Sequence, residues 1–268
     1  MSMFSIIRTG MNAANKDLAV ISNNIANAST NGFKRSEAQF ESMYFSQHNN
    51  STEVARGMGV KNIKPRQSFS QGSFQQTGGS LDLAIMGEGF FILGQPINQD
   101  DIANEKFKYT RDGSFQVDQL GNIVNTDGLP LMGEGKVPIN VPVSLVNENG
   151  DPLIMSEIRV TEEGFIQVTY GLDDTRTVGQ ILLADFVNEH GLQNVGNARF
   201  TETPESGEPT EAFAKEVTMG KILPGALEKS NTDITDELVT MLRTQHAFNG
   251  CSKILQSDID TVKRLLGG

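Results

Sequence analysis

The sequence is 268 residues long, corresponds to 29.2 kDa and is 37% hydrophobic, which is enough for a folded core and argues against a disordered chain. Its formal net charge is −11, from 22 Lys and Arg against 33 Asp and Glu, and the basic residues are scattered. No nucleic-acid partner is expected, because phosphate recognition needs clustered cations. The single cysteine, Cys251, cannot form an internal disulfide and is most simply a small packing residue.

The first residues, Met-Ser-Met-Phe-Ser-Ile-Ile-Arg, lack a charged head, an apolar run and a small-residue cleavage site. A cleaved signal peptide is therefore not expected. No run of 18 apolar residues is present either, so membrane insertion is not expected. On these grounds alone the sequence would indicate a cytoplasmic protein.

An N-terminal helix is predicted within residues 1–36. Steps of three and four residues connect an apolar stripe typical of a coiled-coil seam, with Ala14 in its middle. We expect the other members of this stripe to mediate self-association: Phe4, Ile7, Met11, Leu18, Ile21 and Ile25. Asn31-Gly32 can supply the left-handed backbone that ends a helix, and the Asn23, Asn24 and Asn27 amides can bond to neighbouring backbone.

Residues 37–72 are polar and poorly periodic, and Gly57, Gly59 and Pro65 interrupt them. This composition predicts a linker or an extended arm.

Residues 73–203 differ from the preceding segment in containing short apolar runs of strand length, which predict an antiparallel all-β domain. Asp112-Gly113, Leu120-Gly121 and Glu163-Gly164 separate successive runs and indicate hairpin turns. Gly87-Glu88-Gly89 is likewise interpreted as a hairpin turn. Three prolines mark residues 204–229 as a linker that returns the chain to its C-terminal part.

Residues 230–268 predict one long C-terminal helix. Asn231 and Thr232 are candidate N-caps, acidic residues follow them, and Lys263 and Arg264 fall in the last turn. Alternate steps of four and three residues define a second apolar seam, broken by Gln245 and Ser252. The expected self-association residues of this seam are Ile234, Leu238, Met241, Phe248, Leu255, Ile259, Val262 and Leu266.

The sequence therefore predicts an α+β fold, in which long N- and C-terminal helices form a coiled coil and an antiparallel all-β domain is inserted between them. Two interpretations of the helices remain open. They pair on the core of their own chain, or they are completed only by copies of themselves.

No catalytic, cofactor-binding or metal-ligating residues are predicted. His48, His190 and His246 are isolated, and His246 and Cys251 do not share a helix face. The Gly87–Gly94 stretch lacks the glycine spacing and the following helix of a nucleotide loop. An enzyme and a bound cofactor are therefore not expected.

Residues 21–35, Ile-Ser-Asn-Asn-Ile-Ala-Asn-Ala-Ser-Thr-Asn-Gly-Phe-Lys-Arg, resemble the signature of the rod and hook proteins of the bacterial flagellum. The matching motif residues are Asn23, Asn24, Asn27, Gly32 and Phe33. Ser80–Ile85, Gly87–Phe91, Tyr109–Phe115 and Gly225–Asn231 are similar to further stretches of this family and follow in family order.

The resemblance implies a non-enzymatic subunit of a tubular axis that transmits torque and lets export pass through its channel. It implies a location in the basal body, within the cell envelope, after export through the flagellar type III apparatus without a cleaved signal peptide. The implied partners are copies of the chain, neighbouring rod and hook proteins, the export apparatus and the ring bushing proteins.

Within the family, the length of the chain favours a distal rod protein, because hook proteins usually carry a further outer domain. A proximal rod protein and a hook protein without that domain are the alternatives, since residues 40–57 are short for a distal rod protein. The alternative from another class is a secreted adhesin or binding module.

Overall fold

The computed structural model of the chain describes residues 3–47, 54–94, 107–142, 144–146, 152–171, 174–216 and 219–266. They form two compact units, which we describe separately. The helical unit comprises Met1–Ala28, Arg35–Ser68 and Thr232–Gly268, and the β unit comprises Ser29–Lys34 and Phe69–Asn231. Each unit is built from segments that are far apart in the sequence.

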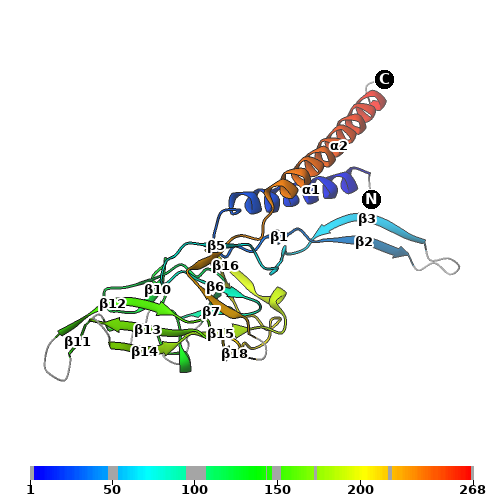
Figure 1. The fold of residues 1–268 in the computed structure, drawn as a ribbon. Helices are drawn as coiled ribbons and strands as arrows, with labels where there is room; N and C mark the ends of the chain where they lie inside the picture. Colours follow the sequence, from blue (N-terminus) through cyan, green and yellow to red (C-terminus); the bar gives the residue numbers. More distant parts are fainter. Residues whose placement is uncertain are drawn as a thin grey trace. The chain divides into compact units, whose positions relative to one another are not determined.

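The helical unit contains the two long helices expected at the chain ends (Figure 1). Its elements are α1 (Met3–Ala26), β1 (Ser36–Glu37), β2 (Phe40–Gln47), β3 (Val54–Asn62), β4 (Arg66–Gln67) and α2 (Ile234–Leu266). The residue that caps α2 differs from the expected Asn231 and Thr232. Asp233 Oδ1 accepts hydrogen bonds from the Thr235 and Asp236 amides at 2.8 and 3.4 Å, which satisfies amides left free at a helix start.

The expected linker or arm at residues 37–72 contains a two-stranded antiparallel hairpin. Phe40 of β2 lies opposite Asn62 of β3, and Gln47 lies opposite Val54. The Val60 amide donates to Thr9 Oγ1 of α1 at 3.4 Å. A two-stranded ribbon has no fully buried face, so it leaves little apolar alternation for sequence reasoning to detect.

The β unit contains a six-stranded sheet in the order β16-β17-β8-β7-β15-β18 and a four-stranded sheet in the order β11-β12-β13-β14. Two-stranded ribbons β9–β10, β6–β19 and β5–β20 accompany them, and all pairings are antiparallel. The first half of these strands is β5 (Phe74–Gln76), β6 (Leu83–Met86), β7 (Phe90–Leu93), β8 (Lys108–Thr110), β9 (Phe115–Val117), β10 (Ile123–Asn125) and β11 (Ser144–Val146).

The second half of the β unit follows the same antiparallel plan. Its strands are β12 (Pro152–Val160), β13 (Phe165–Tyr170), β14 (Asp174–Gln180), β15 (Leu182–Asp185), β16 (Gln193–Gly196), β17 (Arg199–Thr201), β18 (Thr210–Phe213), β19 (Lys221–Pro224) and β20 (Ala226–Glu228). Two short 3-10 helices, η2 (Glu134–Lys136) and η3 (Glu189–Gly191), lie between strands. The fold is therefore α+β, as predicted.

The position of β7 between two buried clusters explains why its sequence is apolar without interruption. Phe91 and Leu93 belong to one buried cluster, whereas Phe90 and Ile92 belong to a second one. Successive side chains of a strand point to opposite faces, so both faces of the six-stranded sheet are covered at β7. The core of the β unit consequently consists of two apolar layers on either side of this sheet.

Several turn and linker expectations need correction. Leu120-Gly121 and Glu163-Gly164 do connect hairpins, β9–β10 and β12–β13. Gly87–Gly89 instead joins β6 and β7, and Asp112-Gly113 joins β8 and β9, which belong to different sheets in both cases. The expected return linker at residues 204–229 instead contains β18, β19 and β20, which pair with β15, β6 and β5. Ile222 of β19 and Leu227 of β20 are buried in these pairings.

Candidate self-assembly interface

Helices α1 and α2 run antiparallel and meet along one line of polar and small residues. Asn24 Nδ2 donates to Glu237 Oε1 at 3.1 Å, and Thr244 Oγ1 donates to Asp17 Oδ2 at 2.7 Å. A Cβ atom added at Gly10 would lie 3.7 Å from Cys251 Sγ. Successive contacts are seven residues apart on both helices, and the residue numbers fall along α1 as they rise along α2.

This register also defines where α2 extends beyond α1. The helices have 24 and 33 residues. Met3, the first residue of α1, is seven residues before Gly10 and therefore falls opposite Asp258, seven residues after Cys251. Residues of α2 after Asp258 therefore have no residue of α1 opposite them. Ile259, Val262 and Leu265 lie in this overhang and are exposed.

A second group of apolar side chains faces away from α1. Leu238 and Leu242 are one residue after Glu237 and two residues before Thr244, so each is rotated from the contact line by about 100° or more at about 100° per residue. Leu242 is 56% exposed, and Leu238 and Val239 are also exposed. The side of α2 that meets α1 thus includes polar and small residues, whereas Leu238 and Leu242 remain uncovered.

Asn24 joins three segments of the helical unit. Besides its bond to Glu237, its side chain donates to the Ser36 carbonyl at 2.8 Å and accepts from the Ser36 amide at 2.9 Å. Asn24 is 1% exposed. Burial raises the pKa of Glu237, and the Asn24 hydrogen bond opposes this shift. A single amide therefore connects α1, α2 and β1.

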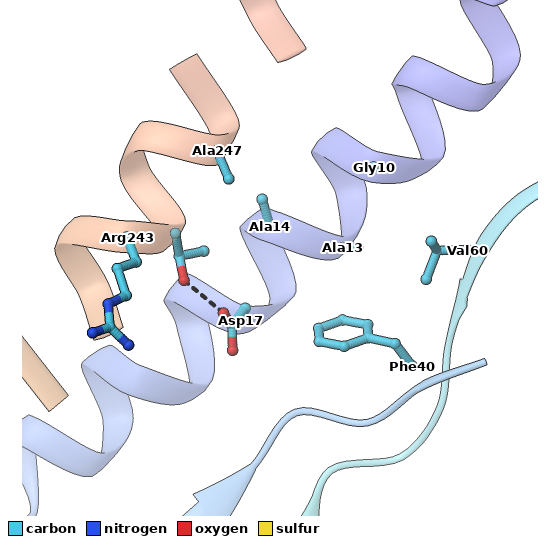
Figure 2. A pocket seen from close by; sticks show the side chains of 9 residues that line it. Gly10, Ala13, Ala14, Asp17, Phe40, Val60, Arg243 and Ala247 are labelled. Carbon is cyan, nitrogen blue, oxygen red and sulfur yellow. Dashed lines mark hydrogen bonds between the residues drawn. The ribbon is translucent and has the colours of Figure 1, made fainter. Parts of the chain in front are cut away.

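An open groove of about 490 Å³ lies beside this contact line (Figure 2). Figure 2 shows small side chains from both helices on one side and two apolar side chains from the hairpin on the other, next to the Asp17–Thr244 hydrogen bond. Small residues allow helix backbones to approach closely. The groove is lined by Gly10, Ala13, Ala14, Asp17, Phe40, Val60, Arg243, Thr244 and Ala247.

The self-association residues expected from the sequence occupy several environments. On α1, Ile21 is buried, Phe4 is exposed, and the half-buried ones are Ile7, Met11, Leu18 and Ile25. On α2, the half-buried ones are Met241, Phe248 and Leu255, and the exposed ones are Ile234, Leu238, Ile259 and Val262. The side chain of Leu266 lies outside the described part of the chain. Met241, Phe248 and Leu255 lie three residues before Thr244, Cys251 and Asp258, and therefore on the side of α2 that meets α1, whereas the exposed members of the stripe lie off this side.

The other motif residues have local roles. The Asn27 amide bonds to the Asn23 and Asn24 carbonyls, and Asn27 Nδ2 donates to the Asn23 carbonyl at 2.9 Å, which ends α1. In the β unit, Gly32 has φ +65° and its amide donates to the Glu228 carbonyl at 2.8 Å. Phe33 beside it is buried.

Sequence reasoning missed a buried ionic cluster in the β unit. Lys34 Nζ lies 2.7 Å from Glu228 Oε1, and Arg111 Nη1 lies 3.8 Å from Glu228 Oε2. Burial lowers the pKa of Lys34, while the Glu228 carboxylate opposes this shift. Lys34 follows Gly32-Phe33 within the motif, but a single lysine in a polar stretch carries no signal of burial. Only the fold brings it to Glu228.

No group of three or more His, Cys, Asp or Glu side chains among the residues described is arranged to hold a metal ion. Neither described helix is long and apolar enough to cross a membrane.

Three families of known proteins match successive parts of the chain. Residues 6–34 match "Flagella basal body rod protein", residues 84–170 match "Flagellar hook protein FlgE/F/G D1 domain", and residues 223–266 match "Flagellar basal body rod FlgEFG protein C-terminal". The first and third matches cover most of α1 and α2, and the second lies within the β unit.

Individual relatives extend the similarity over nearly the whole chain. The flagellar basal-body rod protein FlgG of Buchnera aphidicola subsp. Schizaphis graminum is 34% identical over 272 residues, covering 97% of this chain and 96% of that protein. FlgG of Agrobacterium fabrum is 31% identical, covering 95% and 94%. The flagellar hook protein FlgE of Escherichia coli is 40% identical but covers only 48% of this chain and 29% of that protein. The chain therefore belongs to the family of flagellar basal-body rod and hook proteins.

Proposed function

We propose that the chain is a structural subunit of the flagellar distal rod, and that it assembles by packing the uncovered apolar faces of α1 and α2 against helices of neighbouring copies. Full-length similarity to FlgG proteins supports the rod assignment. The observation that carries the assembly step is the exposure of Leu238, Leu242 and Leu265 on α2. The role is structural rather than catalytic.

The uncovered side chains contribute a substantial part of the free energy of association. Fully burying an exposed Leu, Ile or Val contributes about 1.5–3 kcal/mol. Six side chains that are about half exposed would contribute roughly 5–9 kcal/mol, to be set against the roughly 4–15 kcal/mol lost when two molecules associate. The six on α2 are Leu238, Val239, Leu242, Ile259, Val262 and Leu265.

We further propose that α1 and α2 form a coiled coil within each subunit. The seven-residue spacing of the Asn24–Glu237, Asp17–Thr244 and Gly10–Cys251 contacts supports this arrangement. Residues 1–36 and 230–268 would then supply the inner helical part of the assembly. The β region between them would form its outer part.

Contacts between copies in a rod are heterologous, because one face of each helix pair meets a different face of the next. Heterologous contacts that do not close generate open helical filaments. We expect the partners to be copies of the chain, adjacent rod and hook proteins, the ring bushing and the export apparatus, through which the chain would pass without a cleaved signal. The location would be the basal body within the cell envelope.

The test is self-association of the purified full-length chain, measured by analytical ultracentrifugation and electron microscopy. Leu238→Asp and Leu242→Asp should abolish higher assemblies, because each places a charge on an uncovered apolar face. Thr240→Asp introduces the same charge at an exposed position that is two residues from both leucines, about 160° around the helix from each, and serves as the matched control. A wild-type chain that stays a folded monomer at every concentration, unaffected by either leucine change, would favour a binding module and contradict the proposal.

A further inference from the structure

The chain crosses the boundary of the β unit four times, between residues 28 and 29, 34 and 35, 68 and 69, and 231 and 232. Any tension in the rest of the chain enters the β unit through the residues next to these crossings. The structure shows that these residues are bonded to one another inside the unit.

The centre of this arrangement is the ion pair between Lys34 and Glu228, whose side chains are both fully buried. Lys34 Nζ also donates to the Ser70 carbonyl at 2.9 Å. Glu228 Oε1 accepts from the Gly72 amide at 2.8 Å, and the Glu228 carbonyl accepts from the Gly32 amide at 2.8 Å. One pair of side chains thus connects the segments around residues 32–34, 70–72 and 228.

Two further residues extend the network. Asn231 Nδ2 donates to the carbonyl and to the hydroxyl of Ser70, both at 3.0 Å. Arg111 Nη1 donates to the Gly87 carbonyl at 2.8 Å, and its guanidinium lies 5.0 Å from the centre of the Phe90 ring. Phe90 belongs to β7 in the six-stranded sheet. Arg111 therefore links the ion pair to the core of the unit.

Equilibrium stability does not by itself account for such a pair. Replacing a buried ion pair by apolar residues of similar volume is often neutral or stabilising. An ion pair with short hydrogen bonds differs from an apolar contact in being directional and effective only over a short range. The hydrophobic effect, in contrast, is non-directional. The pair is therefore suited to resist displacement of the segments that it joins.

We propose that Lys34 and Glu228 form a force-bearing clamp, which holds tension at the chain crossings and at the end of β20, and keeps it from reaching the six-stranded and four-stranded sheets of the β unit. The clamp concerns this unit alone and does not depend on the assembly proposed above. Asn231 reinforces it where the chain leaves toward α2, and Arg111 anchors it to the sheet.

The test compares unfolding under load with unfolding at equilibrium, using the full-length chain held at its two termini in a single-molecule force experiment. The decisive variant combines Lys34→Met with Glu228→Leu, which replaces the pair by apolar residues of similar size. We expect its unfolding rate at a given force to rise roughly tenfold or more, the change expected when a charge-assisted hydrogen bond is lost before the transition state. Its denaturation midpoint without force should change little.

The matched control combines Lys215→Met with Glu163→Leu, which removes an exposed ion pair of the same unit that lies away from the crossings. Its unfolding rate under load should match the wild type. If the clamp variant does not fold, Asn231→Ala provides the test, because it removes the two bonds to Ser70, leaves both side chains of the ion pair in place and should raise the rate under load. An unchanged rate under load in the clamp variant, or in Asn231→Ala where that variant replaces it, would overturn the proposal.

Discussion

Asn24 and Glu237, 213 residues apart in the sequence, are joined by a buried hydrogen bond of 3.1 Å in the helical unit. The same asparagine makes two hydrogen bonds with the backbone of Ser36. This bond is one of the three α1–α2 contacts that are spaced seven residues apart on both helices, and it fixes the two helices in one axial alignment. A slip of α2 by one turn would break this bond, although Asn24 would keep its two bonds to Ser36.

Replacing Asn24 by alanine should lower the free energy of unfolding by about 2–4 kcal/mol, since it leaves the Glu237 carboxyl and the Ser36 amide buried without this partner. Chemical denaturation followed by circular dichroism measures the change. The control is Asn23→Ala, which alters an exposed neighbour and should cost less than about 0.5 kcal/mol. Equal losses in the two variants would contradict the role of Asn24.

Gly32→Ala should destabilise the β unit by about 3 kcal/mol or more. The residue has φ +65°, and a Cβ there would overlap the backbone of Arg111 and Asp112. Left-handed backbone and steric overlap both contribute to this cost. Gly78→Ala is a matched control, because Gly78 has φ +74° but no atom within 4 Å of the added Cβ. It should cost only about 1–2 kcal/mol, measured by thermal unfolding.

Gly10→Cys should form a disulfide with Cys251 under mild oxidation. A Cβ at position 10 would lie 3.7 Å from Cys251 Sγ, close enough for small rotations to reach bonding geometry. Non-reducing electrophoresis and mass spectrometry of the peptides detect the bridge. Asn12→Cys places a thiol on an exposed position of the same helix and should stay unbridged to Cys251. Bridging at position 12 but not at position 10 would show that the antiparallel register is wrong.

Glu189 should make the stability of the β unit depend on pH. Burial, assisted by the charge of Glu88, raises the pKa of Glu189 from an ordinary value of 4.5 to about 7. Between these values the folded state holds a proton that the unfolded chain has released, so the free energy of unfolding falls as pH rises from about 4.5 to about 7.

Glu189→Gln removes this group's titration and should be more stable than the wild type at pH 8, while the two should differ little at pH 4. Denaturation midpoints measured across this range provide the comparison. Glu208→Gln, at an exposed position of the same unit, should leave the pH dependence unchanged. If the wild type and Glu189→Gln lose stability in parallel as pH rises, then Glu189 is not the titrating group.

The sequence by itself determined the elements whose signals are local. Seven-residue periodicity and end residues located α1 and α2, short apolar runs located many of the strands, and the motif at residues 21–35 indicated the family. The hairpin of β2 and β3 escaped prediction, because a ribbon without a fully buried face needs little alternation of apolar residues. Strands β18 to β20 escaped because each is short and gains its pairing from a distant partner.

Only the tertiary structure decided which face of each helix meets the other. Periodicity indicates Ile7, Ala14 and Ile21, but the observed contacts come from Gly10, Asp17 and Asn24, which follow them by three residues and carry no hydrophobic signal. The Lys34–Glu228 pair is similar, since its members are 194 residues apart and each resembles an ordinary surface charge in the sequence. Polar contacts between distant residues depend on geometry that forms only when the chain folds, whereas apolar periodicity is a property of the local sequence.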